Sequence, residues 1–243
     1  MSDEFDELVG EIDDSLDLTI YIDSAELIEE VTAQTVLAIE EGLLERGEFH
    51  LVLTGGTLGV AISQALLEIW NKTPEMYSGL HIWFSDERYV ASDSSERNAY
   101  PLHGRVTNTN IVIHEARATD NSASINEAVE DYERQLEGVV IDLNILGMGP
   151  DGHVASLFPS IADIDDPRVI FAITDSPKPP AARISFTMAC INASREVWLV
   201  ATGAAKAEAV AKIIEGDLSI PASFVSAVNR TRLIVDQEAF LAE

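Results

Sequence analysis

The sequence predicts an α/β protein in which a mostly parallel central sheet is flanked by helices. Short apolar runs alternate with longer amphipathic stretches along the chain, a pattern typical of βαβ units. Polar or glycine-rich stretches follow several of the apolar runs. The 243 residues suffice for a sizeable core, and we see no repeat, low-complexity tract or long linker that would divide them. We therefore expect a single domain over residues 1–243.

The elements of the N-terminal half follow from apolar periodicity and from capping residues. Asp23 with Glu26 forms a capping-box-like start for the first helix, and Gly55–Gly56 supplies the turn before the second. We expect a polar connection after the third strand, through residue 98. The expected strands are 18–22, 50–53, 80–84 and 111–113, and the expected helices are 23 to about 46, 58–70 and 123–136.

The C-terminal half continues the alternation. A strand at 197–201 followed by a helix at 204–214 is a clear strand–helix pair. The proline-rich segment Ser176–Pro180 is too short to separate domains and is expected to be an extended loop. The other expected elements are apolar runs at 141–146, 169–173 and 183–188, a strand at 232–235 and a short terminal helix.

Four polar or glycine-containing stretches come directly after expected strands. They are residues 54–57, 85–88, 147–153 and 202–203. In an open parallel sheet, ligands bind beyond the carboxyl ends of the strands. We therefore expect these four stretches to converge on one edge of the sheet and to form the functional site there.

The composition excludes several classes of function. A net charge of −27 with only 15 Lys and Arg residues disfavours binding to nucleic acid or to anionic membranes. No apolar run approaches the roughly 18 residues of a membrane span, and the acidic stretch Met1–Glu7 does not resemble a signal peptide. A single cysteine, Cys190, excludes an intrachain disulfide. We expect a cytoplasmic protein, in which an anionic substrate would require the few basic residues to be concentrated at its site.

Residues 147–152 match the dinucleotide-binding pattern G-x-G-x-x-G. That pattern needs a crossover helix whose N-terminus holds the pyrophosphate. Only five residues separate His153 from Pro159, and residues 160–167 have no helical face. Asp175 falls near the spacing of the ribose-binding acid, so the cofactor interpretation stays open at this point, although it is weak.

The histidine that follows this pattern offers different chemistry. A glycine-rich turn at a strand end lets backbone amides approach an anion or a developing oxyanion. The imidazole of His153 titrates near neutral pH and can exchange a proton there. Asp151 could orient the ring. Judged alone, the stretch is equally compatible with a loop histidine beside a turn-forming aspartate.

Other stretches are compatible with an anion site. Gly55, Gly56 and Thr57 open an expected helix and could hold a single phosphate, or be a simple turn. Residues 86–88 and 96–98 are charged clusters of the kind that is usually solvated, but their position after a strand favours a function. Lys206 lies in the first turn of a helix, where the helix dipole disfavours a cation unless an anion compensates.

Nucleophilic catalysis by a serine and metal binding both lack support in the sequence. Ser156 has no nucleophile elbow around it. The five histidines lack zinc-ligand spacing, so we predict no metal site and expect them to be scattered over the surface and core: His50, His81, His103, His114 and His153.

Several segments in order resemble one family. They read LTGGT (53–57), FSDERYV (84–90), SERNAY (95–100), ILGMGPDGHVASLFP (145–159), SPKPPAARIS (176–185) and TGAAKAEAV (202–210). Together they resemble the 6-phosphogluconolactonase family, within the wider glucosamine-6-phosphate isomerase/lactonase superfamily. The similarity runs from about residue 20 to the end of the chain, and the block at 145–159 is its most specific part.

The resemblance implies a Rossmann-like domain that hydrolyses 6-phospho-D-glucono-1,5-lactone in the oxidative pentose phosphate pathway, without a metal or organic cofactor. It implies that His153 is the general base and Asp151 its electrostatic partner. The partner molecule would be the phosphosugar lactone, and the protein a monomer or small homo-oligomer. The implied phosphate-binding residues are Gly55, Gly56, Thr57, Arg183 and Lys206, and the implied substrate-lining residues are Asp86, Arg88, Arg97, Gly149 and Gly152.

Two alternatives remain beside the lactonase. The related amino-sugar phosphate isomerase resembles D-G-H-I-A-F-N-E-P in this loop, with a catalytic glutamate where this chain has Phe158. A non-catalytic phosphosugar-binding protein would keep Thr57 and Lys206 but would have no use for His153. The glycine turn also departs from many relatives, since Leu58–Gly59 stands where a proline is common, although the backbone amides remain available.

Overall fold

The computed structural model describes residues 17–241 apart from residue 74, and a parallel sheet lies at its centre. In these residues seven strands pair in the order β1-β10-β9-β6-β2-β3-β5, each pair parallel. The predicted α/β class is confirmed, and the acidic stretch Met1–Glu7 lies outside the described residues. The strands are β1 (Asp17–Tyr21), β2 (Phe49–Leu53), β3 (Leu80–Phe84), β5 (Val112–Ile113), β6 (Leu143–Gly147), β9 (Glu196–Ala201) and β10 (Arg230–Asp236).

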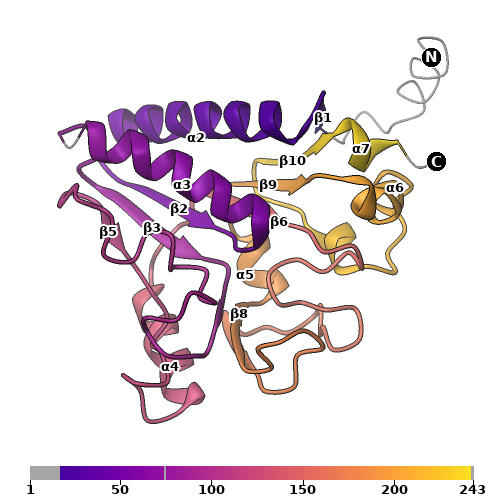
Figure 1. Ribbon diagram of the computed structural model, residues 1–243. Helices are drawn as coiled ribbons and strands as arrows, with labels where there is room; N and C mark the ends of the chain where they lie inside the picture. The colour runs from indigo at the N-terminus through magenta and orange to yellow at the C-terminus, as the bar shows by residue number, and fades with distance from the viewer. Residues whose placement is uncertain (1–16, 74, 242–243) are drawn as a thin grey trace.

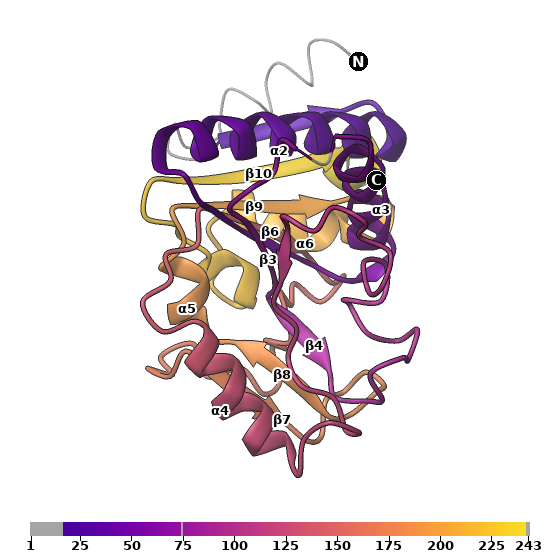
Figure 2. The ribbon, with the colours of Figure 1, turned by 90° about the vertical axis from the view of Figure 1, so that its left-hand side faces the viewer.

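Helices cover both faces of this sheet (Figures 1 and 2). On one face, α2 (Ser24–Arg46) and α3 (Gly56–Lys72) lie side by side over the strands. On the other face lie α5 (Met188–Asn192) and α6 (Ala207–Ile214). The remaining helices are α4 (Ile125–Gln135) and α7 (Gln237–Phe240).

Strand β2 shows how the sheet separates two apolar cores. Leu51 and Leu53 belong to the core under α2 and α3, whereas Val52 between them belongs to the core on the opposite face. All five residues of β2 are buried. Because helices cover both faces of this parallel strand, it is apolar on both faces apart from His50 rather than alternating between apolar and polar residues.

A second, smaller sheet lies below the first and is antiparallel (Figure 2). It has the order β4-β8-β7 and consists of β4 (Asp86–Arg88), β8 (Arg183–Phe186) and β7 (Ile170–Ile173). The expectation of a merely polar connection from residue 85 to 98 was wrong for Asp86–Arg88. This charged triplet forms a strand because it pairs with β8, almost a hundred residues later, and a local pattern cannot reveal such a partner.

Helix α2 begins as the sequence predicts. The Asp23 carboxylate accepts hydrogen bonds from the backbone N–H of Ala25 and Glu26, each 2.9 Å long. The Glu26 carboxylate accepts from the N–H of Ile22 at 2.7 Å. Gly47 ends the helix in the left-handed conformation at φ 78°. Among the helices in the described residues, none combines the length and apolarity of a bilayer span.

The histidines are less scattered than expected. His50 lies beside His81 on the neighbouring strand, and the two rings stack with centroids 4.6 Å apart. His81 Nδ1 lies 3.0 Å from Nε2 of His114, and the His114 ring stacks on Trp83. Parallel pairing brings the rings of His50 and His81 together, because residues at matching positions on adjacent strands share one face of the sheet. His114 follows directly after β5, the strand on the other side of β3. We call His50, His81 and His114 the histidine row.

Candidate active site

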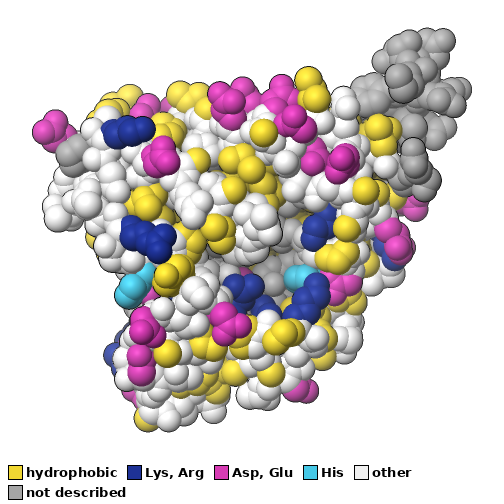
Figure 3. Space-filling view, in the orientation of Figure 1, with side chains coloured by type: hydrophobic (Ala, Val, Ile, Leu, Met, Phe, Trp, Pro, Cys, Tyr) yellow, Lys and Arg dark blue, Asp and Glu magenta, His cyan; other side chains and the backbone are white. Residues whose placement is uncertain are grey.

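A cavity of about 330 Å³ opens at the carboxyl ends of the central strands. All four predicted stretches contribute to it, as the sheet topology led us to expect. Lys and Arg side chains gather with a histidine around a hollow near the centre of the face in Figure 3. The residues that line the cavity are Thr54, Gly55, Gly56, Thr57, Leu58, Asp86, Arg88, Asn98, Gly147, Met148, Gly149, Pro150, His153, Ala155, Lys178, Arg183, Val200, Ala201, Thr202 and Lys206.

The charge of the lining is opposite to that of the whole chain. Four cationic side chains line the cavity, namely Arg88, Lys178, Arg183 and Lys206, against one carboxylate, Asp86. The chain as a whole carries 42 acidic and 15 basic residues. Basic groups are thus concentrated here, which favours an anionic ligand.

The turn between β2 and α3 presents backbone amides to the cavity. Gly56 begins α3 at φ 73°, a left-handed conformation that suits glycine. Gly55 lies so close to Asn98 that a Cβ there would be 1.8 Å from its Oδ1. The first turn of α3 contains no acidic residue. Its free N–H groups and the Thr57 side chain are therefore available to an anion.

The glycines of the 147–152 motif fold a tight loop rather than introduce a helix. The N–H of Gly149 donates to the carbonyl of His153 at 2.9 Å, and the N–H of Gly152 donates to the carbonyl of Gly149 at 3.0 Å. A Cβ on Gly149 would lie 1.9 Å from His153 Nδ1, so only glycine leaves room for the ring. The described residues 148–169 contain no helix. The cofactor interpretation therefore lacks the element that it requires.

His153 and Asp151 are in direct contact. His153 Nδ1 lies 2.5 Å from Asp151 Oδ1. A carboxylate only accepts, so Nδ1 carries the proton and Nε2 of the neutral ring is free to act as a base. Burial lowers the pKa of His153 below its ordinary 6.5, although the hydrogen bond to Asp151 opposes this. Burial acts to raise the pKa of Asp151, but the contacts with His153 outweigh it and the pKa is lowered.

Phe158 packs under the histidine. It is 1 % exposed, and its ring centroid lies 4.5 Å from that of His153. The ammonium of Lys178 and the guanidinium of Arg183 lie 5.8 and 5.7 Å from the same ring. An apolar, electron-rich surface therefore occupies the position at which the isomerase-like loop carries a carboxylate.

Arg183 is almost fully engaged by the protein. Its Nε donates to the carbonyl of Pro180 at 3.0 Å, and its Nη2 donates to the carbonyls of Lys178 and Pro179 at 3.1 Å each. Its Nη1 lies 3.4 Å from Ser156 Oγ. The guanidinium, although it borders the cavity, thus fastens the proline-rich loop to β8.

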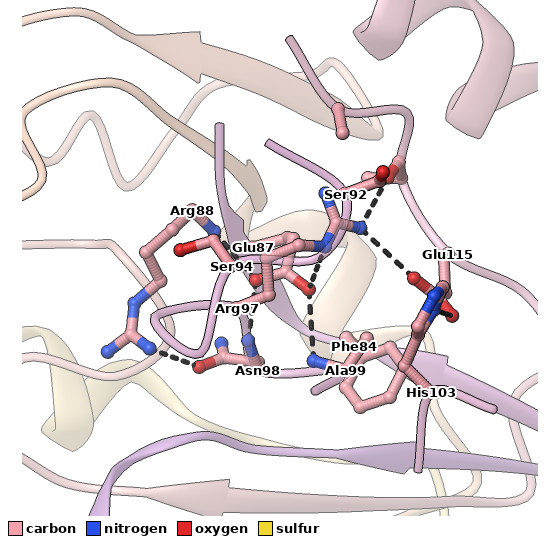
Figure 4. Close-up of polar contacts among 12 residues, drawn as sticks. Phe84, Glu87, Arg88, Ser92, Ser94, Arg97, Asn98, Ala99, His103 and Glu115 are labelled. Atoms are coloured by element: carbon pink, nitrogen blue, oxygen red, sulfur yellow. Dashed lines mark hydrogen bonds and ion pairs between the residues drawn. The ribbon is translucent and has the colours of Figure 1, made fainter. Parts of the chain in front are cut away.

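Asn98 joins two charged side chains of β4, Arg88 and Asp86. Its Oδ1 accepts from Nη1 of Arg88 at 2.7 Å (Figure 4). Its Nδ2 donates to the Asp86 carbonyl and carboxylate at 2.7 and 2.8 Å. The other carboxylate oxygen of Asp86 accepts from Ser156 at 2.6 Å. Asn98 therefore fixes both charged groups at the edge of the cavity.

Arg97 does not line the cavity, and the prediction that it does was wrong. It is 3 % exposed and points to the buried Glu87, with 3.6 Å between Nε and Oε2, and to Glu115 at 3.3 Å (Figure 4). Its Nη2 also donates to the Ala116 carbonyl at 2.7 Å. Burial raises the pKa of Glu87 to about 7. Arg97 is held inward because a buried carboxyl group needs a nearby cation.

Lys206 ends a 3₁₀ turn and stands at the N-terminus of α6. Burial lowers its pKa, and the nearby charge of Lys178 lowers it further. No side chain caps α6 at this position. An anion bound here would accept hydrogen bonds from the free N–H groups of α6 and would neutralise the charge of the Lys206 ammonium.

The structure brings most of the predicted site residues together. Asp151 contacts His153 from outside the lining. Gly152, at φ 73°, shapes the loop without lining the cavity. The sequence reasoning missed Asn98 and Lys178 as site residues, although both lie in stretches that it quoted. The predicted residues that line the cavity are Gly55, Gly56, Thr57, Asp86, Arg88, Gly149, His153, Arg183 and Lys206.

The described residues contain no group of three or more His, Cys, Asp or Glu side chains arranged to hold a metal ion. The histidine row meets its neighbours through ring stacking and hydrogen bonds instead. Cys190 lies outside the cavity lining, and burial raises the pKa of its thiol to about 12.

Comparison with known proteins assigns the family. The family model described as glucosamine-6-phosphate isomerases/6-phosphogluconolactonase matches residues 22–235. A protein of Mycobacterium tuberculosis named 6-phosphogluconolactonase is 34% identical over 247 residues, covering 93% of this chain and 97% of that protein.

Solved structures share the fold. That of a 6-phosphogluconolactonase from Thermotoga maritima has a TM-score of 0.76 and 26% identity, covering 91% of this chain and 100% of the other. A monomeric glucosamine-6-phosphate deaminase has a TM-score of 0.77 at 18% identity, over 92% of this chain and 98% of the other, which shows a common fold. With the family model matched over most of its length, the chain belongs to the glucosamine-6-phosphate isomerase/6-phosphogluconolactonase family.

Proposed function

We propose that this protein hydrolyses 6-phospho-D-glucono-1,5-lactone to 6-phosphogluconate, the second step of the oxidative pentose phosphate pathway. The observation that carries the proposal is the contact of His153 Nδ1 with the Asp151 carboxylate, at a cavity lined with cations. The name of the M. tuberculosis relative supports the same reaction.

In the proposed reaction, Nε2 of His153 takes a proton from water while the water oxygen attacks the lactone carbonyl carbon. The imidazolium that forms is stabilised by the Asp151 carboxylate on Nδ1. The tetrahedral intermediate then collapses, the bond from the carbonyl carbon to the ring oxygen breaks, and His153 returns its proton to that oxygen. The reaction consumes only water and needs no cofactor.

The phosphate is proposed to bind where amides and cations meet. Gly55, Gly56 and Thr57 offer the N-terminus of α3, and Lys206 lines the same cavity. Arg88 supplies a further cation from β4. Arg183 completes the positive environment, although most of its donors already bind protein atoms. Backbone amides together with cations form the ordinary phosphate site of α/β proteins.

The isomerase reaction is less well supported. It needs a further carboxylate to move protons on the sugar, and Phe158 occupies that position as a buried, apolar ring. Because the solved deaminase shares the fold, fold alone does not separate the two activities. The side chain at position 158 favours the lactonase.

The test is a lactonase assay with product identification, run beside glucosamine 6-phosphate, on wild type and two variants. We expect His153→Ala to lower kcat about 10²–10⁴-fold, because it removes the general base. We expect Lys206→Ala to raise KM mainly, because it contacts phosphate and not the reacting carbon. Thermal unfolding curves control for folding.

Hydrolysis by folded His153→Ala at the wild-type rate, after subtraction of spontaneous hydrolysis, would exclude the proposed base. An unchanged KM in Lys206→Ala would remove that residue from the phosphate site. Turnover of glucosamine 6-phosphate in place of the lactone would establish the isomerase instead.

A further inference from the structure

The proline-rich loop Ser176–Pro180 carries a charged side chain to the histidine–aspartate pair. Lys178 Nζ lies 3.4 Å from His153 Nδ1 and 3.5 Å from Asp151 Oδ1. The loop follows β7 and is distant in sequence from the glycine-rich loop. The ammonium, the imidazole and the carboxylate therefore form a compact triangle built from two separate segments.

The backbone of this loop is held by a side chain of β8. The buried guanidinium of Arg183 binds the carbonyls of Lys178, Pro179 and Pro180. The N–H of Ser176 donates to the carbonyl of Ala181 at 3.0 Å. Because the backbone at Lys178 is held by a residue that is 5 % exposed, the fold fixes the point from which the Lys178 side chain extends toward the pair.

The donors and acceptors of the triangle determine what Lys178 can do. His153 Nδ1 carries a proton when the ring is neutral, so it cannot accept from the ammonium. The imidazole Nδ1 and the Lys178 ammonium instead both contact Oδ1 of Asp151. The ammonium thus holds the carboxylate in place and opposes a second positive charge on the imidazole, since like charges this close disfavour each other.

Other charged groups near the His153–Asp151 pair include one that favours the imidazolium form of His153 and one further cation. Asp86, on β4, favours the imidazolium form, but its carboxylate also faces Arg183 at 3.6 Å. Lys206, at the start of α6, lies within the electrostatic reach of both Lys178 and Asp151. Lys178 is nevertheless the cation in direct contact with both members of the pair.

We propose that Lys178 is a positioning residue of the His153–Asp151 pair: it shares the Asp151 carboxylate with the imidazole and keeps the resting imidazole neutral and protonated on Nδ1. The arrangement itself does not depend on the substrate. Its kinetic consequence rests on the proposed function, because a neutral His153 is the form that can accept the proton of water.

The first test measures kcat/KM against pH for wild type, Lys178→Met and Lys178→Arg. Met keeps most of the side-chain length and removes the charge. We expect the acid limb of the Lys178→Met pH profile to move to higher pH by about half to one unit. Loss of one close positive charge raises the pKa of the His153 imidazole by about this amount. We expect Lys178→Arg to keep the wild-type limb. An increased KM with an unshifted limb in Lys178→Met would overturn the proposal and make Lys178 a substrate contact.

The second test follows the Cε1–H proton NMR signal of His153 without substrate, assigned with His153→Gln. We expect the ring to titrate at higher pH in Lys178→Met than in wild type and in Lys178→Arg. Identical titration in wild type and Lys178→Met would refute the positioning role even in an active lactonase. If the wild type hydrolyses no lactone while its ring titrates as expected, the proposed function fails and the role of Lys178 stands.

Discussion

Among the individual residues of the site, Asn98 shows how a neutral side chain can arrange charged ones. Its amide accepts from Arg88 with one end and donates to Asp86 with the other. Its own backbone is fixed by the buried Glu87, whose carboxylate accepts from the N–H of Asn98 at 2.6 Å. Gly55 packs directly against the amide. Asn98 thereby connects β4 with the phosphate-binding turn proposed above.

We predict that Asn98→Ala raises KM for the lactone about tenfold or more, because Arg88 loses a charge-assisted hydrogen bond that orients it. Asn98→Asp is the matched variant. It keeps the acceptor for Arg88 but places a carboxylate beside Asp86, so we expect a smaller rise in KM together with lower stability. Steady-state kinetics and urea unfolding measure both effects.

A double-mutant cycle with Arg88→Met distinguishes orientation from a general loss of structure. If Asn98 acts through Arg88, its substitution should have little further effect on KM once Arg88 is absent. Fully additive effects would show that Asn98 acts by another route.

At the scale of elements, the helix N-termini differ according to whether they face the cavity. Side chains cap α2, α4, α5 and α7, through Asp23, Ser124, Thr187 and Asp236. In contrast, the N-cap residues of α3 and α6 are Gly55 and Lys206, and neither provides a side-chain cap. Both of these residues line the cavity. Free N–H groups are thus kept where an anion is proposed to bind.

The capped helix α2 offers a prediction that is independent of catalysis. Asp23→Ala removes the acceptor of two backbone N–H groups and should lower the free energy of unfolding by about 1 kcal/mol. Asp23→Asn retains a side-chain acceptor and should lose less. Both variants should keep the wild-type kcat, because α2 does not border the cavity. Equal stability of wild type and Asp23→Ala in urea unfolding would contradict the capping role.

At the scale of the whole molecule, the sheet generates features that no single element contains. The histidine row is one of them. Burial lowers the pKa of His50, and repulsion from His81 lowers it further. Burial likewise lowers the pKa of His114, and its hydrogen bond with Gln135 opposes this. Trp83 Nε1 donates to Nδ1 of His50 at 3.0 Å, a contact that requires this nitrogen to be unprotonated.

We predict that His50 and His114 contribute to a loss of stability in acid. In the unfolded chain these two histidines have a pKa near 6.5, whereas in the folded state their pKa is lower. Below about pH 6.5 the unfolded state therefore binds more protons, and the free energy of unfolding falls as the pH falls towards the folded pKa. Urea unfolding at pH 7.5 and pH 5.5 measures the loss.

His50→Asn is the matched variant, because its Oδ1 can accept from Trp83 but cannot be protonated in this range. We expect its stability to fall less between the two pH values than that of the wild type. An equal fall in both proteins would show that His50 takes no part in the pH dependence.

Much of the fold could be predicted because its causes are local. The apolar strands, the capped start of α2 and the glycine turns depend on neighbouring residues, and the structure places them within a few residues of the prediction. The convergence of the four stretches was predictable because parallel strands end at a common edge. The strand Asp86–Arg88 was missed because its pairing with β8 outweighs its polar composition.

The sequence by itself determined the loop that carries His153 and Asp151, since the two residues are close neighbours in a glycine-rich turn. It also determined that Phe158, and not a carboxylate, follows them. Only the tertiary structure decided that Arg97 turns inward to Glu87 and that Lys178 reaches the pair from a distant loop. Both depend on long-range packing, which places charged groups by the burial and the partners that they meet, and neither is written in the local pattern.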